Sequence, residues 1–159
     1  MSQSLSNRTV EFASGTTGSM PFNLESSNSY YYPVVQTVPG ELGGCTAYYL
    51  SAAATTNATS VKATAGQLYG FYCSNIHTVP YYLKFYNLAA APTVGTSTVF
   101  MCFEISEGPG AGTGQVSFAT FEGGIPFSTG LAFGVTADFA DTGTTAVTAS
   151  TLKINLWYK

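Results

Sequence analysis

The chain has 159 residues, of which 45% are apolar and 8% are charged, with a net charge of −3 and a pI near 4.8. This length suffices for one domain that buries most of its surface without disulfides or metal ions. Nucleic acid is disfavoured as a partner because neutralising phosphates requires clustered basic residues. The basic residues of this chain are scattered: Arg8, Lys62, Lys84, Lys153 and Lys159.

The sequence also disfavours membrane insertion and secretion. No apolar stretch approaches the length of a transmembrane helix, and the start MSQSLSNRTVEF lacks the features of a secretory signal. The cysteines, Cys45, Cys73 and Cys102, form neither an even set nor a Cys-x-x-Cys pair. A disulfide framework and a zinc site are therefore disfavoured. Cys73 and Cys102 lie inside apolar strands, which indicates small buried thiols in a protein made in a reducing cytoplasm.

Residues 1–44 differ in composition from the rest of the chain. Ser, Asn, Thr and Gly dominate up to Ser29, and the following SYYYPVVQTVPGELGG contains Pro33 and Pro39. Proline forbids a helix through this part and disfavours a central strand. We therefore predict an extended N-terminal arm over residues 1–44, in which Tyr30–Val38 is an edge strand or a contact segment. The alternative is a floppy tail followed by a first strand.

From Cys45 onward, short apolar segments alternate with turn signals, and no convincing helical period is present. Val116 and Phe118 are expected to point inward, and Glu122–Pro126 is expected to turn the chain. The pattern predicts an all-β domain over residues 45–159, a jelly-roll or Greek-key sandwich of about eight strands. The expected strands are Thr46–Thr56, Thr59–Ala65, Gln67–Ser74, Tyr81–Leu88, Thr98–Ser106, Gln115–Phe121, Phe127–Ala137 and Leu152–Lys159.

The stretch Gln67–Leu88 is predicted to form a hairpin whose two strands are apolar on both faces. An antiparallel sheet with one solvated face alternates apolar with polar residues. One face of the hairpin is therefore expected to cover the core, with Leu83 and Phe85 pointing inward. The other face is expected to meet a second subunit, with Tyr82 and Tyr86 near that surface.

The chain shows no constellation of side chains that supports catalysis. His77 is the only histidine, and no nucleophile motif accompanies it. Glu104 and Glu107 fall on opposite faces of a strand, whereas acid–base chemistry needs converging groups. Asp138 and Asp141 lie in a Thr-rich loop, where Asx turns explain them better than calcium ligation does. We predict no enzymatic activity, no catalytic residue, no cofactor and no metal site.

Tyrosines are the strongest candidates for an interaction site. Several of them are adjacent, and adjacent strand residues point to opposite faces, so each run puts at least one ring outward. Tyr is enriched at interfaces because the ring buries area while the hydroxyl stays hydrogen-bonded. The alternative is that these rings cap the edge of the sandwich. The predicted interface residues are Tyr30, Tyr31, Tyr32, Tyr48, Tyr82 and Tyr86.

Several short motifs between residues 50 and 159 occur in the order in which a known family carries them. This part of the chain resembles a small module of tailed-bacteriophage virion proteins, whereas residues 1–44 do not. The resemblance implies a β-sandwich subunit of a phage particle. The motifs are GQLYG at Gly66–Gly70, YLKFYN at Tyr82–Asn87, APTVGT at Ala91–Thr96, FSTGLA at Phe127–Ala132, an acidic loop at Ala137–Thr145 and NLWYK at Asn155–Lys159.

The resemblance and the aromatic strands lead to one hypothesis and one alternative. The hypothesis is a capsid decoration (cement) protein on the virion surface, which binds the major capsid protein and associates with itself as a trimer or dimer. Its arm would lie on the major capsid protein or on a neighbouring subunit. The alternative is a head-fibre or tail-associated module that recognises cell-surface glycan. Trp157 is the one tryptophan available to stack on a sugar, and strand alternation points it away from Leu156.

Overall fold

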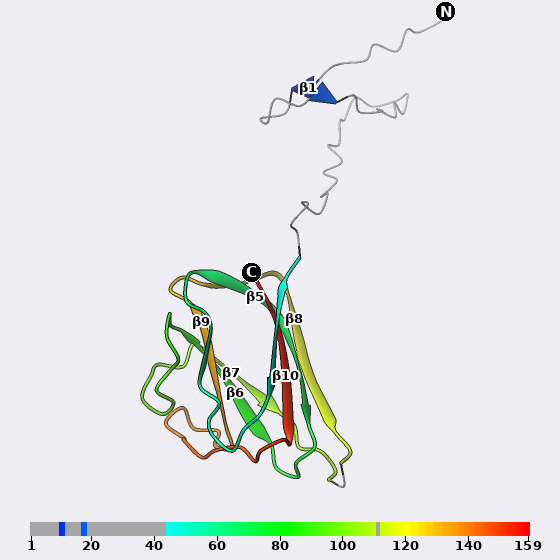
Figure 1. The fold of residues 1–159 in the computed structure, drawn as a ribbon, viewed down its shortest axis with the longest axis vertical. Helices are drawn as coiled ribbons and strands as arrows, with labels where there is room; N and C mark the ends of the chain where they lie inside the picture. The colour runs from blue at the N-terminus through cyan, green and yellow to red at the C-terminus, as the bar shows by residue number, and fades with distance from the viewer. Residues whose placement is uncertain (1–9, 12–16, 19–43, 111) are drawn as a thin grey trace, which may run out of the picture. The chain divides into compact units, whose positions relative to one another are not determined.

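The computed structural model describes residues 10–11, 17–18, 44–110 and 112–159 (Figure 1). The chain divides into two units, Met1–Val38 and Pro39–Lys159. In the first unit, β1 (Val10–Glu11) pairs antiparallel with β2 (Thr17–Gly18). The remainder of the predicted arm, including the three tyrosines at residues 30–32, lies outside the described residues.

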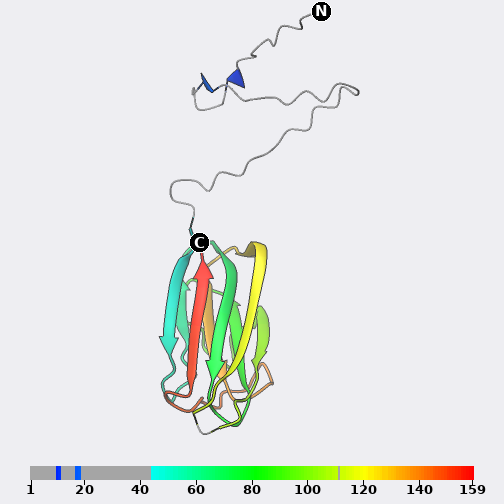
Figure 2. The same cartoon turned by 90° about the vertical axis from the view of Figure 1, so that its right-hand side faces the viewer.

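The second unit is built from two antiparallel sheets of four strands each, which confirms the prediction of an all-β domain. Figure 2 shows the first sheet face-on, with β3 cyan, β10 red, β5 green and β8 yellow from left to right. Its strands are β3 (Thr46–Ser51), β10 (Leu152–Tyr158), β5 (Gly66–Asn75) and β8 (Gln115–Phe127). The second sheet has the order β4 (Thr59–Lys62), β9 (Leu131–Thr136), β6 (Tyr81–Asn87) and β7 (Met101–Ile105).

The core lies between the two sheets and contains a cluster of phenylalanines. Phe71 on β5 contacts Phe103 of the second sheet, with ring centroids 4.9 Å apart, and Phe85, with centroids 6.3 Å apart. Leu83 and Phe85 are fully buried, so the prediction that they form core is confirmed. Aromatic contacts of this kind add to the free energy gained by burying the rings, and here they join one sheet to the other.

The predicted hairpin over Gln67–Leu88 is wrong, because β5 and β6 lie in different sheets. β5 pairs with β10 and β8, whereas β6 pairs with β9 and β7. The connection between them crosses from one sheet to the other and is held by the buried Asn75. Its amide donates to the carbonyls of Val79 at 3.0 Å and Ser106 at 3.2 Å, and its Oδ1 accepts the His77 N–H at 2.9 Å. Each strand is apolar because it covers the core, and no shared outer face exists.

The expected turn at Glu122–Pro126 is also wrong, because β8 continues through it to Phe127. Leu68 pairs with Ile125 and Gly70 with Thr120, so residues 121–124 of β8 lie opposite the single residue Tyr69. Gly123 and Gly124 have φ values of 80° and 75°, which only glycine adopts at little cost. The two glycines therefore form a bulge within the strand rather than its end.

Val116 and Phe118 point to solvent, so the prediction that they face inward is wrong. Phe118 is 72% exposed, whereas its neighbours Ala119 and Ser117 lie on the inner side. The Ser117 hydroxyl accepts a hydrogen bond from the backbone N–H of Ser106 at 3.1 Å. This bond satisfies the inward-pointing hydroxyl at the edge of the core. The prediction that the apolar residues of this strand point inward therefore assigned its inner and outer sides the wrong way round.

Candidate interaction surface

The outer side of the first sheet carries a set of exposed aromatic side chains, here called the aromatic face. It comprises Tyr49 on β3, Trp157 on β10, Tyr72 on β5 and Phe118 on β8. The register places Tyr49, Asn155, Tyr72 and Phe118 in one row across all four strands. Directly opposed residues of antiparallel strands point to the same side, so these side chains form one surface.

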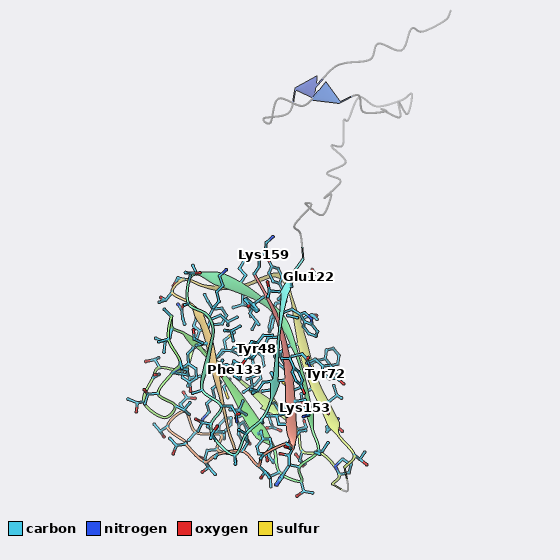
Figure 3. The ribbon with its side chains drawn as sticks, in the orientation of Figure 1. Tyr48, Tyr72, Glu122, Phe133, Lys153 and Lys159 are labelled. Atoms are coloured by element: carbon cyan, nitrogen blue, oxygen red, sulfur yellow. The ribbon has the colours of Figure 1, made fainter. Side chains whose placement is uncertain are left out.

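The alternation of side chains along β3 decides which tyrosine belongs to this surface. Tyr48, a predicted interface residue, points into the space between the sheets, where its ring meets Phe133 edge-on at 5.8 Å (Figure 3). Tyr49 points outward and is 60% exposed. The pair Tyr48-Tyr49 showed that one ring must face outward, but the sequence did not show which.

The aromatic face is poor in charge. Lys153 on β10 lies beside the aromatic row, and its Nζ donates to Ser51 Oγ at 2.5 Å. Ser74 and Val116 complete the row that contains Lys153 and Ser51. Figure 3 shows Tyr72 on the outer side of the sheet, near Lys153. Aromatic residues together with few charges are typical of the centre of a protein–protein interface.

On the outer face of the second sheet, in contrast, the chain's own loop after β9 covers β6, whereas Cys102 and Glu104 on the edge strand β7 are exposed. Lys84 on β6 is fully buried, and its Nζ donates to the carbonyl of Ala140 at 2.5 Å. Tyr82, a predicted interface residue, is half-buried and packs edge-on against Phe139, with ring centroids 5.5 Å apart. The loop therefore covers the side of β6 that the sequence analysis assigned to a second subunit.

Tyr86 is fully buried, so the expectation that it lies near the surface is wrong. Burial, and then the neighbouring Asp141 carboxylate, raise the pKa of the Tyr86 phenol. Asp141 belongs to the same loop that covers Lys84. The polar, Thr-rich loop returns over this side of the sheet, and this explains the error.

The groups considered for catalysis take part in local packing. His77 Nε2 lies 3.2 Å from Thr148 Oγ1, and its ring packs against Tyr81. Glu104 is exposed opposite Tyr82, and Glu107 is exposed in the following loop. Within the described ranges, no group of three or more His, Cys, Asp or Glu side chains is arranged to hold a metal ion.

Asp138 organises its loop and makes the stability of the protein depend on pH. Its Oδ2 accepts the backbone N–H of Thr145 at 2.7 Å. The Thr145 hydroxyl, and then this N–H, hold the pKa of Asp138 below its usual value. A carboxyl with a lowered folded-state pKa stabilises the fold above its unfolded pKa of about 3.9. This contribution disappears as the pH falls through the folded-state pKa.

We therefore expect Asp138→Asn to lower the melting temperature at pH 6 and to lower it less and less as the pH approaches 2. Thermal unfolding followed by circular dichroism over this pH range measures the difference between variant and wild type. Asp141→Asn, the same change three positions further along the loop, is the control for the loss of a carboxylate from this loop. An Asp138→Asn difference that stays constant with pH would contradict the assignment.

The three cysteines differ in accessibility, and this gives a second expected result. Cys73 is buried in the core, and burial raises its pKa to about 12. Cys45 and Cys102 are exposed, so the expectation of a buried thiol is wrong for Cys102. Burial of its sulfur also raises the pKa of Cys102. The thiolate is the reactive form, so iodoacetamide at pH 8 should modify Cys45 first, then Cys102, and Cys73 only after unfolding.

Peptide mass spectrometry over a time course reads this order directly, with labelling in 6 M guanidinium as the reference for complete reaction. Modification of Cys73 in the native protein at the rate of Cys45 would contradict the packing of β5 described above.

No protein-family description, no curated protein sequence and no solved structure matches this chain. Among the described residues, no helix has the length and apolar character needed to cross a membrane.

Proposed function

We propose that the protein is a non-catalytic structural subunit of a tailed-bacteriophage virion, a decoration protein that binds and stabilises the outer capsid shell. The observation that carries the proposal is the aromatic face, an exposed aromatic surface that is poor in charge. A large exposed apolar patch on a folded domain marks an interaction site. The motif resemblance of residues 50–159 to phage virion modules supports a phage particle as the assembly.

The strand connectivity supports a jelly roll as the architecture of this subunit. The strands pair from the outside of the chain inward, β3 with β10, β4 with β9, β5 with β8 and β6 with β7. The chain changes sheet at every connection except the one between β6 and β7. An eight-stranded, two-sheet jelly roll has two such nested Greek keys, and this fold is common in viral capsids.

The proposed partners are the major capsid protein and further copies of the chain, as a trimer or dimer on the virion surface. The arm over residues 1–44, with Tyr30, Tyr31 and Tyr32, would contact the shell or a neighbouring subunit. An extended segment can add to the edge of a sheet through backbone hydrogen bonds without any charged motif. Many copies bound to one shell gain strength through multivalency, even if each contact is weak.

The test is to mix the purified protein with expanded capsids that carry no decoration, and to measure bound protein by sedimentation. We expect saturable binding at a fixed number of copies per capsid, and a higher melting temperature of the decorated shell. A truncated chain that lacks residues 1–29 should bind more weakly. If truncation leaves both shell binding and self-association unchanged, the role of the arm is wrong. Absence of saturable binding overturns the proposal.

One observation favours a second candidate function, a head-fibre or tail-associated module that binds cell-surface glycan. Trp157 and Tyr72 are exposed on the same sheet face, and aromatic rings of this kind stack on sugars. A glycan array and a host-cell binding assay test this candidate. Glycan binding without capsid binding would replace the decoration proposal with this one.

A further inference from the structure

We propose that a second copy of this chain covers the aromatic face, so that two first sheets pack face to face around a two-fold axis parallel to their strands. This deepens the self-association within the proposed function and rests on that part of it. The first reason is the difference between the two sheets. The chain's own loop covers the central strand β6 of the second sheet, where Lys84 and Tyr86 are buried, whereas Tyr49, Trp157 and Phe118 on the first sheet stay exposed.

The second reason is that the face is complementary to itself. A two-fold axis between β10 and β5 exchanges β3 with β8 and β10 with β5, while each cross-strand row keeps its height. In the central row, Tyr49 then faces the partner's Phe118, and Asn155 faces the partner's Tyr72. Isologous pairing requires this reciprocity, in which residue i meets j and j meets i.

The neighbouring row is compatible with the same axis. Ala47, Trp157, Gly70 and Thr120 lie across the four strands at one height. The axis brings the Trp157 indole over the partner's Gly70, which has no side chain. Gly70 is buried, and a methyl group there would lie 2.6 Å from the carbonyl oxygen of Ala119 and 3.5 Å from the Trp157 ring of the same chain. The indole therefore already packs over Gly70 within one copy, which leaves its outer side to meet the partner.

The third reason is the size and shape of the face. β5 has 10 residues, which extend about 33 Å, and four strands spaced about 4.8 Å apart cover about 19 Å, giving roughly 600 Å². Specific interfaces begin at about 600 Å² per partner, so the face suffices for a weak, reversible pair. Small-molecule and glycan sites are usually concave. The domain does have a hollow, lined by Asn87, Ser97 and Phe100, but these residues do not belong to the aromatic face.

The experiment is sedimentation velocity of the full chain, without capsids, from about 1 to 500 μM, in which a weak pair appears as concentration-dependent dimerisation. We expect Phe118→Glu to weaken dimerisation at least tenfold, and Tyr49→Lys to do the same. The double variant Tyr49→Lys/Phe118→Glu should regain at least tenfold over either single variant, because each new lysine faces a new glutamate across the axis. Circular dichroism checks that every variant is folded.

Phe139→Glu is the matched control, because Phe139 is 75% exposed but lies outside the aromatic face. It should dimerise like the wild type. A wild-type chain that is monomeric up to 500 μM overturns the proposal, as does a dimer that survives Phe118→Glu or a double variant without recovery. Quenching of Trp157 fluorescence by a glycan in a monomeric wild type would assign the face to sugar instead. Capsid binding is measured separately, so its failure leaves this result standing.

Discussion

Phe71→Ala should lower the free energy of unfolding by about 3–5 kcal/mol, the usual loss when a buried phenylalanine is cut to alanine. Phe71 is 2% exposed and touches rings from both sheets, Phe85 and Phe103 on the second and Phe121 on the first. Its removal leaves a cavity where the sheets meet. Urea unfolding followed by circular dichroism measures the change as a lower midpoint with an unchanged slope.

Phe118→Ala is the matched control for this result, since it removes the same side chain from the outer side of the same sheet. Its effect on the unfolding of the monomer should be within about 0.5 kcal/mol. Equal losses at Phe71 and Phe118 would contradict the assignment of the two faces.

Gly130→Ala should destabilise the domain by about 1–3 kcal/mol, because the methyl group has no space. It would lie 2.6 Å from the carbonyl oxygen of Leu88 and 2.8 Å from that of Lys62. These are backbone atoms of two other segments, so no rotamer change relieves the contact. Asn87 Oδ1 holds this turn by accepting the N–H of Thr129 at 2.8 Å, which prevents Gly130 from moving away.

Gly44→Ala is the control for the glycine substitution, because a methyl group at Gly44 meets no atom within 4 Å. Its unfolding midpoint should match the wild type. A loss at Gly130 no larger than at Gly44 would mean that the loop after β6 and the end of β4 adjust freely. The two glycines can be compared in one series of urea titrations.

Strand positions could largely be predicted from the sequence, whereas sheet assignment could not. Alternating side chains and turn residues located the segments that became β5, β6 and β10 to within a residue or two. The same pattern did not distinguish a hairpin from a connection between sheets, because both place an apolar strand on a core. In the structure, Asn75 holds the connection between the sheets, because its side chain donates to Val79 within the connection and to Ser106 after β7.

The aromatic face could be predicted in type but not in position. The sequence predicted an aromatic surface, and strand alternation placed Trp157 outward, as the structure shows. It named Tyr48 and Tyr86, which are inside, and it missed Tyr49 and Phe118. Which alternate side chains of a strand are buried depends on which face the rest of the chain covers. A loop that returns over Tyr86, or an inward serine at the edge of the core on β8, changes which side chains are buried without changing the apolar pattern of the sequence.

The place of β10 in the first sheet has a consequence for how the protein is made. Within the part of the chain that the structure describes, β3 pairs only with β10, and Ser51 and Lys153, which bond across this pair, are 102 positions apart. At about 5–20 residues per second, β3 leaves the ribosome roughly 5–20 s before its partner. Such non-local pairing slows folding. The sandwich can therefore close only after β10 has been translated. Until then the backbone N–H and C=O groups of β3 lack their partner strand and can pair with a chaperone or with another nascent chain.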